Sequence, residues 1–398
     1  MNQYAISTPE GSRDRLFAAT RLFRQNERRI RNVLEERGYD EIITPSLEYY
    51  DVFVQAGSSI GQEKMYKLTD RNGRLLVLRP DNTTPIARVV TTKLDDDALP
   101  LRLYYVQKVH RASSFHRGHS TEVMQAGAEL LGAKGMMADL DILTAAFEAL
   151  AAVKGEPFRI ELSHAGIYKA LITSLDVDAE TAERIRSHIE NKSYAALGDE
   201  LEPYKDREAY RALKAMPTLF GSGEVLEEVS RLTDNQEVLD AVSYLQELIE
   251  AITAAGFGEN VMIDLGSVQE IDYYTGMMIR GYMGGAGSPV LVGGRYDNLC
   301  AKFGRDIPAT GFAIDIDALS DSVDLKKEIT AQELVFCEIS DLKAALDYVH
   351  DNSQLAELAP CNTEAEAMQM ARKKGYRTLV IFRDGAVTDP QRSRCPSP

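Results

Sequence analysis

Short strand-like segments joined by tight turns constrain the fold of this chain most. Lys64–Leu68 and Leu75–Leu78 flank Asp70-Arg71-Asn72-Gly73, in which Asn-Gly supplies the positive φ angles of a tight hairpin. Two further strands are expected at 101–106 and 122–131, joined through a long loop. Strand pairs of this kind predict a largely antiparallel sheet with helices on one face, which is an α+β layer architecture.

An amphipathic helix is predicted ahead of these strands. Between Arg13 and Gly38, apolar residues recur near the 3.6-residue period, with arginines on the other face. The apolar run 42–44 before Pro45 then predicts a strand. By the same criteria, further helices are predicted at 83–94 and 136–152, and further strands at 158–162, 261–264, 277–280 and 289–292.

The pattern changes twice along the chain and predicts four parts. Strand signals nearly vanish between 164 and 259, which indicates a helical insertion within the sheet-forming core. A strand, two helices and a strand follow near the C-terminus, at 333–339, 342–350, 364–374 and 377–382. The predicted parts are a core in two pieces, 1–163 and 260–323, the helical insertion 164–259, and a small α/β module, 324–398.

Composition limits the class of protein. Of the 398 residues 44% are hydrophobic and 27% are charged, the balance of a soluble globular protein. No apolar run approaches the ~20 residues that span a membrane, and the N-terminus lacks the apolar stretch of a secretory signal, so a cytoplasmic protein is expected. A formal net charge of −16 weighs against a phosphate backbone as partner.

Neither cysteines nor histidines have the spacing of a metal site. The four cysteines are scattered, which agrees with a reducing compartment, and they are Cys300, Cys337, Cys361 and Cys395. The one local group of histidines, His110, His116 and His119, does not match a helical metal pair and favours a polar loop. We therefore expect no metal and no cofactor.

Four segments, in this order, resemble the core of histidyl-tRNA synthetase, a class II aminoacyl-tRNA synthetase. They are the first helix with Gly38–Asp51, then Leu78–Arg88 (LRPDNTTPIAR), then Tyr104–Gly132, and finally Ser267–Tyr282, Val292–Leu299 (VGGRYDNL) and Ala309–Leu319. Each segment alone is weak, but together they extend over about 320 residues. The resemblance implies the class II antiparallel sheet with flanking helices and a dimer formed through this core.

The nucleotide half of the family's site is poorly kept. Arg111 matches the family's second-motif arginine, but Ser113 and Ser114 replace its glutamate and next arginine. Three further family residues are replaced: the phenylalanine under adenine by Val123, the triphosphate arginine by Ala318, and the signature arginine by Gln269. Since loss of one preorganised donor can cost ~3–4 kcal/mol in barrier, these changes together predict no adenylation.

The amino-acid half of the site is better kept. The resemblance implies that histidine would meet Asp81, Thr83, Arg111, Gln125, Glu129, Tyr273, Tyr274 and Tyr296. Asp81 is one methylene shorter than the family's glutamate, while Gln125 and Glu129 lie four apart on a strand and so face one side. Taken singly, each residue also fits a structural position, since tyrosines are common in cores and a strand glutamate is usually solvated.

A histidine site without a nucleotide site resembles one branch of the family, the regulatory subunits of ATP phosphoribosyltransferase. That resemblance implies a non-catalytic chain that assembles with the short-form catalytic subunit, four of each, and makes it active and sensitive to histidine in the first step of histidine biosynthesis. It implies no tRNA and no membrane partner. The alternatives are a working histidyl-tRNA synthetase and another synthetase paralogue that activates an amino acid.

Overall fold

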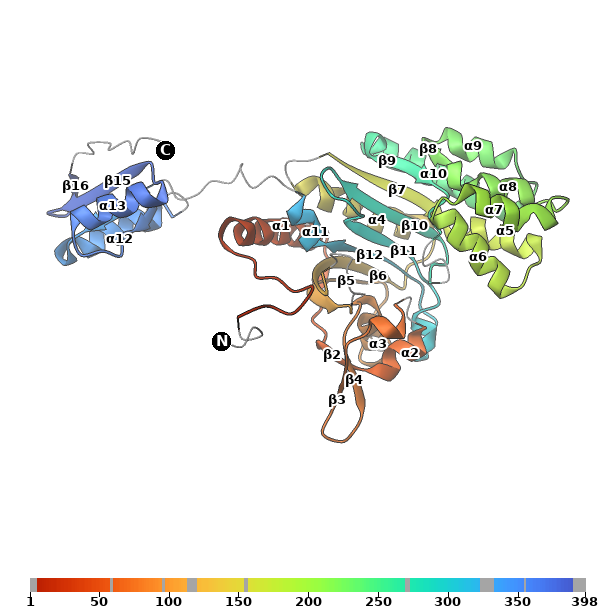
Figure 1. Ribbon diagram of the computed structural model, residues 1–398, viewed down its shortest axis with the longest axis horizontal. Helices are drawn as coiled ribbons and strands as arrows, with labels where there is room; N and C mark the ends of the chain where they lie inside the picture. The colour runs from red at the N-terminus through yellow and green to blue at the C-terminus, as the bar shows by residue number, and fades with distance from the viewer. Residues whose placement is uncertain are drawn as a thin grey trace. The chain divides into compact units, whose positions relative to one another are not determined.

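The computed structural model divides the chain into two compact units, Met1–Asp324 and Leu325–Pro398 (Figure 1). The structure describes residues 6–57, 60–94, 97–112, 120–153, 157–268, 273–322, 333–353 and 356–388. Ser113, Ser114, His116, His119, Gln269 and Cys395 lie outside these ranges.

A nine-stranded sheet forms the centre of the first unit. Its order is β1 (Asp40–Glu41), β5 (Leu101–His110), β6 (Glu122–Leu131), β12 (Ala309–Asp315), β11 (Leu291–Arg295), β10 (Met277–Met283), β7 (Phe158–His164), β9 (Val261–Asp264) and β8 (Phe220–Gly221). Only the pairs β1–β5 and β7–β9 run parallel. The predicted largely antiparallel α+β sheet is therefore confirmed.

Helices pack on both faces of this sheet. On one face, α1 (Phe17–Glu36), α4 (Met136–Ala152) and α11 (Ile316–Asp321) cover a core that includes Tyr104. On the other face, α3 (Thr83–Thr92) packs Ile86 and Val90 against Leu103 and Tyr105, so α1 and α3 lie on opposite sides of β5 (Figure 1). The expectation of helices on one face was incomplete, because β5 carries apolar residues on both of its faces.

A small three-stranded sheet contains the predicted hairpin. Its order is β2 (Leu47–Tyr49), β4 (Leu75–Leu78) and β3 (Lys67–Thr69), and α2 (Tyr50–Ala56) follows β2. The hairpin is confirmed, with Gly73 at φ +80° and the Asp70 carboxylate accepting the N–H of Asn72 and of Arg74. Its first strand starts at Lys67, because 62–64 form the 3-10 turn η2.

The strand predicted at 42–44 was wrong. These residues lie between β1 and β2 without a ladder of their own, although the N–H of Ile42 donates to Tyr104. Side chains bind three of their other backbone groups: the Gln107 amide accepts from the N–H of Thr44 at 3.1 Å and donates to the Ile42 carbonyl at 3.0 Å, and Arg79 donates to the Thr44 carbonyl at 2.7 Å. Apolar composition alone did not reveal these two side-chain partners.

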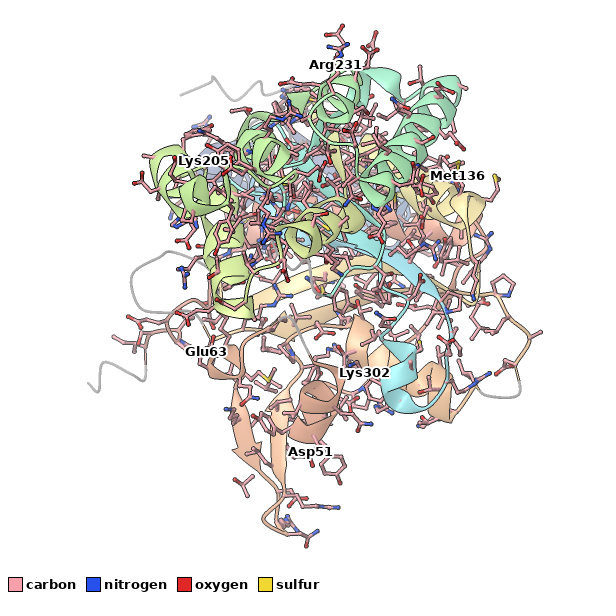
Figure 2. All side chains as sticks on the ribbon, turned by 90° about the vertical axis from the view of Figure 1, so that its right-hand side faces the viewer. Asp51, Glu63, Met136, Lys205, Arg231 and Lys302 are labelled. Atoms are coloured by element: carbon pink, nitrogen blue, oxygen red, sulfur yellow. The ribbon has the colours of Figure 1, made fainter. Side chains whose placement is uncertain are left out.

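Helices follow one another between β7 and β9. They are α5 (Ala165–Leu175), α6 (Ala179–Glu190), α7 (Tyr194–Leu201), α8 (Tyr210–Ala215), α9 (Glu224–Ser230) and α10 (Gln236–Ala254). We call residues 165–254 the helical segment. Its apolar side chains join the main core, and it belongs to the same compact unit as the sheet. In Figure 2 its labelled residues Lys205 and Arg231 lie at the other end of this unit from Asp51 in α2. The four-part division of the chain stays a prediction.

The second unit is a small α/β fold. Its elements are β13 (Glu333–Cys337), α12 (Leu342–Asp351), β14 (Ala356–Leu358), α13 (Glu364–Lys374), β15 (Thr378–Arg383) and β16 (Ala386–Thr388), and its sheet order is β14-β13-β15-β16. Thr363 and Glu366 form a capping box at the start of α13. The three-residue strands β14 and β16 were not predicted, because so few residues give no periodic signal.

Candidate functional site

A cavity of about 100 Å³ opens on the α3 face of the main sheet. All eight residues singled out in the sequence line it: Asp81, Thr83, Arg111, Gln125, Glu129, Tyr273, Tyr274 and Tyr296. They come from the N-terminal end of α3, from β6, and from the segments next to β5, β10 and β11. Residues up to 215 positions apart in the sequence thus line one cavity. No single sequence motif contains all of them.

Glu129 is the buried acid of this cavity. Its side chain accepts a hydrogen bond from the Thr83 hydroxyl at 2.7 Å and another from the Tyr296 hydroxyl. The residue is only 1% exposed, and this burial raises the pKa of the carboxyl to about 8, although both hydroxyls act to lower it. Burial therefore favours the protonated form of Glu129 well above the pH at which a solvated glutamic acid ionises.

Three tyrosines form one wall of the cavity. The rings of Tyr273 and Tyr296 stack with centroids 5.3 Å apart, and Tyr274 meets Tyr273 edge-on at 5.2 Å. Tyr274 also lies over Gly294, where a Cβ would come within 2.9 Å of its ring. Burial raises the pKa of Tyr296 well above its usual value, so its hydroxyl stays a donor. An aromatic wall that also offers a hydroxyl suits a flat polar ring.

Polar groups at the start of α3 face the same cavity. The Asp81 carboxylate accepts from the N–H of Thr84 at 2.8 Å and from its hydroxyl at 3.2 Å, so it also caps the helix. Asn82 donates to Gln125 at 3.3 Å, and its own buried Oδ1 has no hydrogen-bond partner among the described residues. An unpaired buried oxygen of this kind is costly unless a ligand or water donates to it.

Three polar lining residues were missed by the sequence reasoning: Asn82, Thr84 and Tyr105. Asn82 stands between two residues that were chosen, and Tyr105 lies on β5 facing the cavity. The position of Asn82 at the start of α3 could have identified it, because a polar side chain at the start of a helix is available to bind neighbouring groups. Tyr105 gave none, because a tyrosine in an apolar strand is indistinguishable from a core residue.

Acidic groups lie near the positions where the family binds nucleotide. The Asp317 carboxylate accepts from the N–H of Met124, next to Val123, and pairs with Arg15 at 2.7 Å. Asp315 caps the helix that contains Ala318, accepting its N–H at 2.8 Å. Arg111 donates to the Pro80 carbonyl at 2.9 Å and lines the cavity. The positions of Val123 and Ala318 thus lie among carboxylates, one of which is paired with an arginine.

Two further features concern the residues that the structure describes. No cluster of three or more metal-ligating side chains occurs among them. None of the helices in that part of the chain combines the length and the apolar character needed to cross a bilayer.

Comparison with known proteins gives consistent matches over nearly the whole chain. The family model of histidyl-tRNA synthetase matches residues 11–319. An ATP phosphoribosyltransferase regulatory subunit of Clostridium kluyveri is 38% identical over 383 residues, which cover 94% of this chain and 98% of the relative. A protein of the same name from Bacillus cereus is 34% identical over 399 residues, with 98% and 94% covered.

Solved structures agree with this fold. The crystal structure of an ATP phosphoribosyltransferase regulatory subunit/histidyl-tRNA synthetase from Bacillus halodurans is similar with a TM-score of 0.83 at 29% identity, covering 96% of this chain and 99% of the other. A histidyl-tRNA synthetase from Nostoc gives a TM-score of 0.77 at 23% identity, covering 94% and 91%.

Proposed function

The chain belongs to the ATP phosphoribosyltransferase regulatory subunits, within the histidyl-tRNA synthetase family, and from this premise we propose that it binds histidine in the cavity around Glu129. Through that site it makes a short-form catalytic subunit responsive to histidine. The chain itself performs no adenylation. It assembles as a hetero-octamer, four of each chain, on synthetase-like dimers.

The observation that carries the histidine site is the convergence of eight chosen residues on one cavity. The imidazole ring of histidine would stack on Tyr273 and Tyr296. It would also form a hydrogen bond with Glu129, whose side chain accepts hydrogen bonds from two protein hydroxyls in this structure. Asp81 suits the ammonium group and Arg111 the carboxylate, since each lines the cavity and carries the opposite charge. The set matches a zwitterion with a polar aromatic ring.

The absence of adenylation is supported by the surroundings of Val123 and Ala318. A class II site needs an aromatic surface for adenine and cations for the phosphates, whereas here Asp315 and Asp317 occupy the neighbourhood and Asp317 already pairs with Arg15. The proposal that the chain lacks adenylation therefore rests on the replaced family residues and on Arg15 being already engaged with Asp317.

Calorimetry on the purified chain tests the proposal. Histidine should bind at one site per chain, ATP should give no measurable heat, and Glu129→Ala should lose histidine binding while the chain still assembles with the catalytic subunit. Tight ATP binding together with ATP–pyrophosphate exchange would instead establish a synthetase activity. Unaltered histidine binding by Glu129→Ala would place the sensing site elsewhere.

A further inference from the structure

Two side chains of the helical segment bind backbone groups at Val268 and at Tyr274, a residue of the tyrosine wall. Lys169 on α5 donates from Nζ to the carbonyl of Tyr274 at 2.6 Å. Glu190, the last residue of α6, accepts from the N–H of Val268 at 3.0 Å. Tyr273 and Tyr274 both line the cavity, so the Lys169 contact lies on the backbone of the tyrosine wall itself. The helical segment thus donates to the backbone at Tyr274 and accepts from the backbone at Val268.

Glu190 is itself held in place by the sheet. Its second carboxylate oxygen accepts from Arg280 on β10 at 3.1 Å, and the two side chains are only 21% and 18% exposed. Arg280 lies on β10, opposite Glu161 on β7 in the strand register. Partly buried hydrogen bonds between charged groups are stronger and less screened by salt than those of exposed pairs. The Arg280 contact therefore fixes the position of the Glu190 carboxylate that binds the N–H of Val268.

No residue of the helical segment lines the cavity in the part of the chain that the structure describes. We propose that Lys169 and Glu190 are positioning residues that couple the helical segment to ligand binding at the tyrosine wall. The coupling rests on the proposed histidine site. Since coupling free energy is reciprocal, ligand that orders Tyr273 and Tyr274 also steadies the helical segment, and a partner that displaces the segment changes ligand affinity.

A purely structural role for these contacts makes a different prediction. In that case, loss of the Lys169 contact would lower the unfolding free energy and leave the histidine affinity of the folded chain unchanged. Coupling predicts a change of affinity, and it also predicts that histidine protects backbone amides in α5 and α6, which do not touch the cavity.

The test compares three variants of the full chain by histidine calorimetry and urea unfolding. Lys169→Met should weaken histidine binding about tenfold, as expected for loss of one charged hydrogen bond. Lys169→Arg, which keeps a cationic donor, should stay within about threefold of the unaltered chain. The matched control Arg184→Met removes the exposed pair of α6 with Glu200 at 3.0 Å and should bind histidine as the unaltered chain does.

Hydrogen exchange provides a second readout that needs no variant. Histidine should slow exchange in peptides from 165–190 of the unaltered chain. Unchanged affinity in Lys169→Met, or no protection of 165–190 while histidine binds, would overturn the coupling and leave the histidine site standing. If the unaltered chain binds no histidine, the proposed function fails and the coupling fails with it.

Discussion

Glu129 on β6 lies directly opposite Gly311 on β12, and its carboxylate fills the space that a side chain at position 311 would need. A Cβ on Gly311 would overlap Oε2 of Glu129, and the carbonyl of Ala128 would lie 2.6 Å from it. The backbone of Gly311 needs no positive φ, so its role is to make room. The acid of the cavity therefore depends on a missing side chain in the next strand.

Gly311→Ala should displace the Glu129 side chain from Thr83 and Tyr296 and weaken histidine binding by at least about tenfold, the equivalent of one lost buried hydrogen bond. Calorimetry measures the effect. The matched control is Gly198→Ala in α7, where nothing lies within 4 Å of the new Cβ, and there alanine should stabilise the helix by up to ~1 kcal/mol without changing affinity. Equal affinities in both variants would show that the carboxylate position does not matter.

The buried Glu129 should make stability depend on pH. Its folded-state pKa of about 8 lies above its unfolded value, so the native state holds a proton that the unfolded chain has released. The contribution of this proton to the free energy of unfolding is present in full at low pH and is lost as the pH rises towards 8. The loss is at most about 1.4 kcal/mol per pH unit. Glu129→Gln, which cannot ionise, should lack this loss.

Urea unfolding of both forms at pH 5, 6, 7 and 8 measures the difference. As the pH rises, the unfolding free energy of the unaltered chain should fall relative to that of Glu129→Gln. Parallel curves over this range would show that the carboxyl ionises normally in the folded protein.

A buried ion pair joins Arg295, which is next to the tyrosine wall in the sequence, to Asp139. Arg295, next to Tyr296, donates to both carboxylate oxygens of Asp139, at 2.7 and 3.2 Å, and the two residues are 8% and 1% exposed. Arg295→Met should lower the unfolding free energy by about 3–5 kcal/mol, because Asp139 would remain charged and buried.

The double variant Arg295→Met with Asp139→Asn should recover part of this loss, since the isolated charge is gone. Urea unfolding of the single and double variants provides the measurement. A loss below about 1 kcal/mol in Arg295→Met would mean that water reaches the pair and that it behaves as a surface interaction.

Sequence reasoning succeeded where periodicity and turn chemistry were strong. The strand 122–131 and the helix 136–152 were placed at their observed ends. The eight residues implied by the family resemblance line one cavity, and their role in binding stays a prediction. Sequence reasoning did not succeed where side chains replace a ladder, as Gln107 and Arg79 do for residues 42–44. The strand 309–315 was quoted as a motif but not placed as a strand, because its alternation is weak.

The interior of the cavity was beyond the reach of the sequence. A motif can identify Glu129 but not its hydrogen bonds to Thr83 and Tyr296 or its raised pKa, which follow from burial between two strands. Nor does a motif show that Lys169 reaches the carbonyl of Tyr274, 105 residues away along the chain. Contacts of this kind depend on tertiary packing, which local pattern does not encode.

The most direct measurement is ATP phosphoribosyltransferase activity of a short-form catalytic subunit from the same organism, assayed with and without this chain and histidine. Activity should rise sharply when the chain is added, histidine should then suppress it, and Glu129→Ala should keep the rise but resist the suppression. Catalytic activity that is indifferent to the chain would contradict the regulatory function, and equal suppression of the Glu129→Ala complex would contradict the assigned histidine site.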